Sequence, residues 1–173
     1  YTLQVCYDRE RHPRDVRVAV LENERLAATF LPEFGGRFWS LYDKQCGREL
    51  LAVNRVLQPA NLALRNAWFT GGIEWNVGTI GHSAFTMSPL FTARVETAPN
   101  RPLLRFYEWE RLRQIPFQID AFLPDGSSVL YIRVRLINIR QVPIPVCWWS
   151  SAEVPEEPGV RVIVPAETAF TFT

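Results

Sequence analysis

The alternation of apolar and polar residues along the chain predicts a protein built from β-strands. The clearest case is the stretch 129–138, in which four aliphatic residues alternate with residues that point the other way. A period of two is typical of antiparallel strands that bury one face. Residues 16–21 and 25–31 are two short apolar segments separated by three polar residues, which predicts a β-hairpin.

The other strand candidates are short, and turn residues separate them. The segment 37–42 follows a proline and two glycines, and residues 49–51 can pair back on it after a turn. No window of about 11 residues sustains a helical apolar stripe. We therefore predict an all-β fold of two packed antiparallel sheets. The remaining predicted strands are 84–95, 103–111, 115–123, 146–152 and 160–164.

The stretch 54–81 interrupts this pattern. Pro59, Asn61, Asn66 and four glycines break the periodicity, although apolar residues remain. We predict a long structured connection that lies over a sheet. Long ordered loops are uncommon in compact domains unless they carry function, so this stretch is the first place to look for a site.

Composition and charge exclude several classes of protein. The 173 residues are 47% hydrophobic and 21% charged, which predicts a single folded domain over 1–173. The net charge of +1 argues against charge-driven binding of nucleic acid, and the apolar runs are too short for a membrane-spanning helix. Cys6, Cys46 and Cys147 match neither a disulfide framework nor a zinc site. We expect reduced thiols, a cytoplasmic protein and no metal or cofactor.

The densest group of chemically useful side chains lies between Gly71 and His82. This segment supplies Glu74, Trp75 and Asn76 together with four glycines. Aromatic rings stack on the C–H face of a sugar, amides and carboxylates bind hydroxyl groups, and a Glu with a His can exchange protons. The segment therefore predicts a sugar site. The alternative is that the glycines form turns, the tryptophan is a core residue and the histidine has a structural partner.

Two further groups could contribute to the same site. Glu108 and Glu110 share one face of a predicted strand, either as members of an ion-paired surface or as sugar ligands. Trp148 and Trp149 are adjacent in another strand and must point to opposite faces. We predict that one of these tryptophans is a core residue and that the other lines a groove.

Several longer motifs identify a family resemblance. They are LPEFGGRFWSLYDKQCGRELL at 31–51, PANLALRNAWFTGGIEWNVGTIGH at 59–82, LRFYEWER at 104–111 and VPIPVCWWSSAEVPE at 142–156. They resemble an uncharacterised bacterial domain family of the galactose-mutarotase-like class, whose members are often followed by tetratricopeptide repeats. The resemblance implies an antiparallel β-supersandwich, of which this chain is the N-terminal part.

The resemblance extends to sugar binding more readily than to catalysis. Aldose epimerases of this class use a histidine as general acid and a glutamate as base. The comparable strand here, within 142–152, contains no histidine. His82 lies in a different segment and would have to replace it. Because a fold does not fix an activity, sugar binding is the better supported expectation.

These observations give three hypotheses. The first is a carbohydrate-binding or carbohydrate-processing domain; the second is a non-catalytic module that docks a protein partner or its own helical repeats. The third is a hydrolase or lyase that uses two carboxylates, roughly 5 to 9.5 Å apart, from among Glu74, Glu108, Glu110 and Glu153. Unpaired strand edges could also join two copies as a homodimer. For the first hypothesis the catalytic residues are Glu74 and His82, and the sugar-binding residues are Arg37, Trp75, Asn76, Glu108 and Trp149.

Overall fold

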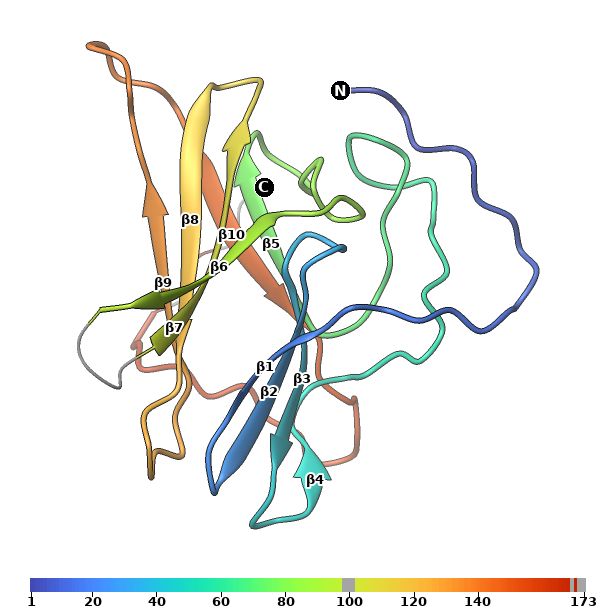
Figure 1. The fold of residues 1–173 in the computed structure, drawn as a ribbon, viewed down its shortest axis with the longest axis vertical. Coiled ribbons are helices and arrows are strands. Elements are labelled where there is room, and N and C mark those ends of the chain that lie inside the picture. The colour runs from blue at the N-terminus through green and yellow to red at the C-terminus, as the bar shows by residue number, and fades with distance from the viewer. Residues whose placement is uncertain (98–101, 169, 171–173) are drawn as a thin grey trace.

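The computed structural model describes residues 1–97, 102–168 and 170. Its strands are β1 (Ala19–Glu22), β2 (Leu26–Leu31), β3 (Arg37–Asp43), β4 (Arg48–Glu49), β5 (Ile73–Gly78), β6 (Phe91–Glu96), β7 (Pro102–Glu110), β8 (Ile115–Phe122), β9 (Tyr131–Leu136) and β10 (Cys147–Ala152). One sheet has the order β1-β2-β3-β5-β10, with β4 paired to β3, and the other has the order β6-β7-β8-β9 (Figure 1). Every strand pairing is antiparallel. The predicted all-β fold of two antiparallel sheets is confirmed. None of the described residues belongs to a helix that could cross a membrane.

Aromatic side chains fill the space between the two sheets. Phe30 of β2 and Phe106 of β7 are fully buried, and their ring centroids lie 5.6 Å apart. Phe38 of β3 stacks on Phe30 with a centroid distance of 4.8 Å. Burying one such side chain contributes about 1.5–3 kcal/mol. These rings hold the first sheet against the second.

The predicted hairpin is confirmed as β1 and β2, and its turn also joins the two sheets. The side-chain oxygen of Asn23 accepts hydrogen bonds from the backbone N–H groups of Arg25 and Leu26, at 2.9 and 2.8 Å. The amide nitrogen of Asn23 donates to the carbonyl oxygens of Pro124 and Ser127, at 2.7 and 2.9 Å. These two carbonyl groups belong to the turn between β8 and β9. One asparagine therefore holds the turns of both sheets together.

The prediction that 54–81 is entirely a connection is wrong, because residues 73–78 within it form strand β5. Ile73, Trp75 and Val77 of this strand face the core between the sheets. Glu74 and Asn76 alternate with them and lie on the opposite face. The period of two is therefore present, but the glycines on both sides of the strand obscure it in the sequence.

Two other predicted strands also differ from the structure. Residues 84–90 form no strand, because they lie in turns in which the N–H of Ser88 donates to the carbonyl of Phe85 at 2.9 Å. Residues 160–164 form no strand either, since no other described segment pairs with them. Val162 and Ile163 are 88% and 85% exposed. A strand-like sequence forms a strand only where a neighbouring strand can pair with it.

A second, smaller apolar cluster covers the outer face of the first sheet. It is formed by Leu31, Phe34 and Phe69, with Trp39 and Met87 packed against it. The N-terminal segment and the connection that precedes β5 run together along this side of the molecule (Figure 1). The Gln4 N–H donates to the carbonyl of Arg65 at 2.7 Å. Part of the outer face of the first sheet is thus covered by irregular chain.

The stability of the second sheet provides one prediction. Arg105 of β7 binds Asp120 of β8 through two hydrogen bonds of 2.6 and 2.8 Å, and the Asp120 side chain is 7% exposed. Asp120→Asn removes the charge from this pair, so we expect it to lower the free energy of unfolding by roughly 1–3 kcal/mol in urea titrations. The control is Glu96→Gln, because the Arg94–Glu96 pair is exposed. Equal effects of both substitutions would contradict the prediction.

Candidate functional site

The centre of the candidate site is a buried carboxylate on the outer face of the first sheet. The side chain of Glu74 is only 3% exposed. The indole nitrogen of Trp68 donates to Oε2 at 3.0 Å, and the hydroxyl of Thr86 donates to Oε1 at 2.9 Å. Burying a carboxylate is costly unless it is hydrogen-bonded, and these two donors offset that cost.

The same carboxylate binds the imidazole of His82. His82 Nδ1 lies 3.1 and 3.0 Å from the two oxygens of Glu74. An ionised carboxylate can only accept, so this contact places the proton of a neutral imidazole on Nδ1. Within the described part of the chain, Nε2 has no hydrogen-bond partner. Since the His82 side chain is 24% exposed, Nε2 is left to accept a proton or a hydrogen bond from a ligand.

Two tryptophans flank this imidazole. The ring centroid of His82 lies 5.4 Å from that of Trp68 and 5.3 Å from that of Trp149. The Trp149 indole nitrogen donates to the carbonyl of Gly81 at 3.3 Å, which ties the ring to the loop that carries the histidine. The two tryptophans do point to opposite faces, because Trp148 packs against the core and Trp149 lies beside His82. That Trp149 lines a groove stays a prediction.

Strand register and a tight loop bring these residues together. In the β5–β10 pair, Trp149 lies opposite Asn76 and Ser151 lies opposite Glu74. Residues opposite each other in antiparallel strands share a face of the sheet. The chain after β5 then turns back over this face, and the N–H of Ser83 donates to the side-chain oxygen of Asn76 at 2.6 Å. This bond holds His82 above the carboxylate.

A buried arginine lies next to the site. Arg37 is 2% exposed, and its Nη1 donates to the carbonyls of Phe69 and Gly71 at 2.9 and 3.0 Å. Its guanidinium carbon also lies 3.9 Å from the centre of the Phe69 ring. Burial lowers the pKa of Arg37 to about 10, and the negative charges of Glu74 and Glu153 oppose this shift. Arg37 thus places a positive charge close to both carboxylates.

Two buried donors near the site have no partner among the residues that the structure describes. They are Nη2 of Arg37 and the amide nitrogen of Asn76, whose side chain is fully buried. Buried donors usually pair with protein groups or ordered water. Arg37 and Asn76 therefore lie beneath the site, where both donors are buried.

Two residues predicted for the sugar groove lie elsewhere. Trp75 points into the core, where its indole nitrogen donates to the carbonyl of Gly36 at 2.9 Å. Glu108 belongs to the second sheet and lies 3.7 Å from Arg111, the ion-paired arrangement that was the alternative for this residue. The other predicted residues, Arg37, Glu74, Asn76, His82 and Trp149, gather around one face of the first sheet.

Glu110 has a structural partner of its own. Its carboxylate accepts the backbone N–H groups of Leu112 and Arg113 at 2.8 and 2.6 Å. Glu110 therefore stabilises the turn between β7 and β8, and its oxygens are already engaged there.

Sequence reasoning missed two residues of the site, Trp68 and Thr86. Trp68 enters it from the connection before β5, where a backbone bridge to Ala60 holds it. Thr86 lies in a segment that was predicted to be a strand. The only signal for either residue was its position within a few residues of the Glu74–His82 segment.

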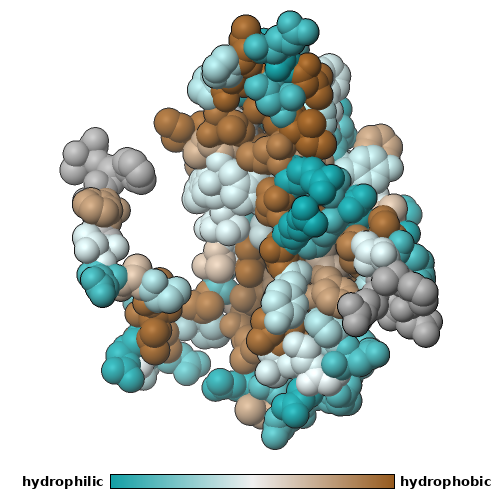
Figure 2. Space-filling view, turned by 90° about the vertical axis from the view of Figure 1, so that its left-hand side faces the viewer, coloured by the Kyte–Doolittle hydropathy of each residue, from teal (hydrophilic) through white to brown (hydrophobic). Residues whose placement is uncertain are grey.

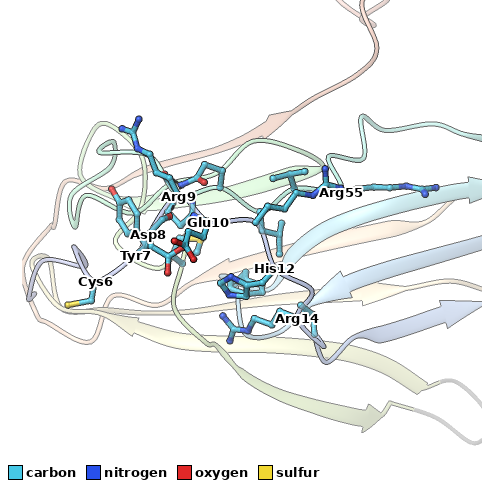
Figure 3. Close-up of a pocket in the computed structure, with 16 residues that line it drawn as sticks. Cys6, Tyr7, Asp8, Arg9, Glu10, His12, Arg14 and Arg55 are labelled. Carbon is cyan, nitrogen blue, oxygen red and sulfur yellow. Dashed lines mark hydrogen bonds between the residues drawn. The ribbon is translucent and has the colours of Figure 1, made fainter.

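Two cavities lined by described residues have different surroundings. A cavity of about 440 Å³ lies under the N-terminal segment, where Arg9, Arg14 and Arg55 are spread around its margin and do not converge on one point (Figure 3). A second cavity of about 580 Å³ is lined by Thr70, Gly71 and Glu153, next to the arginine that supports the site. No group of three or more His, Cys, Asp and Glu residues in the described ranges could hold a metal ion.

Comparison with known proteins places this fold in a wider context. The chain is similar to a TPR-domain containing protein from Parabacteroides distasonis ATCC 8503 whose crystal structure is known, with a TM-score of 0.75 and 28% sequence identity. The match covers 85% of this chain and 25% of that protein, so the chain spans about a quarter of its length. A family model matches residues 3–172, and the chain therefore belongs to the family described as a domain of unknown function, DUF5107.

Proposed function

We propose that this domain binds carbohydrate at the site formed by Trp68, Glu74, His82 and Trp149. The observation that carries the proposal is the half-buried imidazole held between two indole rings with its Nδ1 on a buried carboxylate. Indole rings offer an apolar surface to the C–H face of a sugar, while the exposed ring nitrogen offers an acceptor to a hydroxyl. A sugar combines both of these surfaces in one molecule.

The same geometry supports acid–base chemistry at His82. Its Nε2 can accept a proton from a sugar hydroxyl and return it to a ring oxygen, while the Glu74 carboxylate stabilises the imidazolium that forms. In this scheme Glu74 is a positioning residue, because its oxygens already bind Trp68, Thr86 and His82. The proposed catalytic group is the histidine.

The proposal includes the wider class of the domain. The two antiparallel sheets and the motifs of the chain support a galactose-mutarotase-like β-supersandwich, with residues 1–173 as its N-terminal part. The similarity to a TPR-domain containing protein supports helical repeats elsewhere in the full-length protein. We propose a cytoplasmic protein, consistent with its three free cysteines.

Two tryptophan substitutions test the binding site. Trp149→Ala removes one wall of the site, so we expect calorimetric titration to show a loss of sugar affinity of about tenfold or more. Trp109→Ala is the matched control, because Trp109 is 45% exposed on the second sheet. It should leave the affinity unchanged. Equal losses for both variants, or no loss for Trp149→Ala in folded protein, would contradict the assignment.

A second candidate function is docking of the helical repeats. The similarity to a TPR-domain containing protein favours it, and so does the exposed apolar surface. Phe91 and Tyr107 are both exposed on the second sheet, where their rings stack with centroids 5.4 Å apart. Apolar side chains also gather over the upper part of the face in Figure 2. The connection after β9 exposes Ile139 and Val142. This function predicts that Tyr107→Ala weakens binding of the separate repeat region, while sugars cause no response.

A further inference from the structure

The outer face of β10 continues beyond the candidate site towards the second cavity. Trp149 and Ser151 point to this face, because they lie opposite Asn76 and Glu74. The alternation carries on to Glu153, whose N–H donates to the carbonyl of Gly72 at 2.9 Å. Glu153 directly follows β10 and lies four residues after Trp149 along extended chain, a distance of about 13 Å.

The position of Glu153 is fixed by several contacts. Its backbone carbonyl accepts the N–H of Ala52 at 2.8 Å, and its carboxylate accepts the hydroxyl of Thr70. Arg37 lies close to this carboxylate and to that of the first site, because the charges of Glu74 and Glu153 both raise its pKa. Nη2 of this arginine has no partner among the described residues. The Glu153 carboxylate is thus held at the wall of the second cavity, where it can accept hydrogen bonds from ligand hydroxyl groups.

The cavity next to Glu153 is large enough for a ligand. Its volume of about 580 Å³ lies within the usual range of small-molecule sites, roughly 300–1,000 Å³. Asn54, Thr70 and Arg55 contribute an amide, a hydroxyl and a guanidinium to its lining. Arg55 is exposed and forms no ion pair within the described part of the chain. These groups can donate to and accept from several hydroxyls at once.

We infer that the cavity at Glu153 is a second sugar subsite and that the ligand is an oligosaccharide. This inference rests on the proposed function, because it takes the Trp149 site as the first subsite. One sugar ring cannot span from Trp149 to Glu153, whereas a chain of linked rings along β10 can contact both. The carboxylate of Glu153 and the guanidinium of Arg55 both line this cavity, and they are the groups that would bind the second ring.

The test is calorimetric titration of folded protein with mono-, di- and trisaccharides of glucose, galactose and mannose. For whichever of these three sugars binds, the affinity should rise at least tenfold from its monosaccharide to its trisaccharide. Glu153→Gln should remove this gain and leave monosaccharide affinity unchanged. Arg55→Ala, a change at an exposed side chain with no ion pair, should act in the same way even where Glu153→Gln fails to fold. Glu156→Gln, on an exposed carboxylate, is the matched control and should keep the gain.

Two results would overturn the inference, and a third would overturn the proposed function as well. Equal affinity for mono- and trisaccharides would show a single subsite. Loss of monosaccharide affinity in Arg55→Ala would show that the cavity at Glu153 is not separate from the Trp149 site. Absence of binding by every saccharide to folded wild-type protein would refute carbohydrate binding itself, and that outcome differs from the first two.

Discussion

Glu74→Gln is expected to lower the affinity for carbohydrate by about tenfold or more, and to lower the free energy of unfolding by roughly 1–3 kcal/mol. The two side chains have nearly the same volume, so packing is preserved. The substitution places an NH₂ group where a carboxylate oxygen now faces the donors of Trp68, Thr86 and His82. At least one of these donors loses its acceptor, and the imidazole is no longer held by a charge.

Calorimetric titration and urea unfolding measure the two effects separately. Glu156→Gln makes the same chemical change on an exposed carboxylate, so it should alter neither quantity. If Glu74→Gln bound sugar as tightly as wild-type protein, the carboxylate would have no part in the site. If only stability changed, Glu74 would be a structural residue and His82 would act without it.

Gly72→Ala is expected to destabilise the protein by about 3 kcal/mol or more. The backbone of Gly72 has a φ of +69°, which favours glycine, and an added Cβ would lie 2.3 Å from the carbonyl oxygen of Phe38. Because this contact is with the backbone, β3 and β5 would have to separate. Gly72 also bonds to Ala52 and Glu153, so the end of β10 would move with it.

Thermal unfolding tests this second prediction. A loss of about 3 kcal/mol lowers the Tm by roughly 6–12 °C in a domain of this size. Gly159→Ala is the control, because Gly159 also has a positive φ, of +87°, but an added Cβ meets nothing within 4 Å. It should shift the Tm much less. Similar shifts for both variants would mean that backbone conformation, and not contact with β3, sets the cost.

The alternation of apolar and polar residues was enough to predict strands in which it is not interrupted. The alternation in 129–138 became β9, and the two segments around Asn23 became the first hairpin. Strand β5 was hidden because its polar face carries the site and glycines border it on both sides. A strand that serves a site must place polar residues on a face that is otherwise buried, and this weakens its apolar signal.

The site was only partly predictable for the same reason. Glu74 and His82 were predicted together because they are close in sequence, and the loop after β5 does bring them into contact. Trp75 was assigned to the sugar groove because its strand was not recognised. The alternation of β5 would have placed it opposite Glu74. Trp68 could not be predicted, since an irregular connection with no repeating pattern positions it.

The central claim is that Trp68 and Trp149 form the walls of a sugar site around His82, and tryptophan fluorescence tests it most directly. We would titrate folded wild-type protein with the saccharide panel and follow the emission. Because a bound sugar would contact these two indoles, the account predicts a saturable change that Trp149→Ala reduces and Trp109→Ala retains. Emission that stays constant with every saccharide, from a sample shown to be folded, would contradict it.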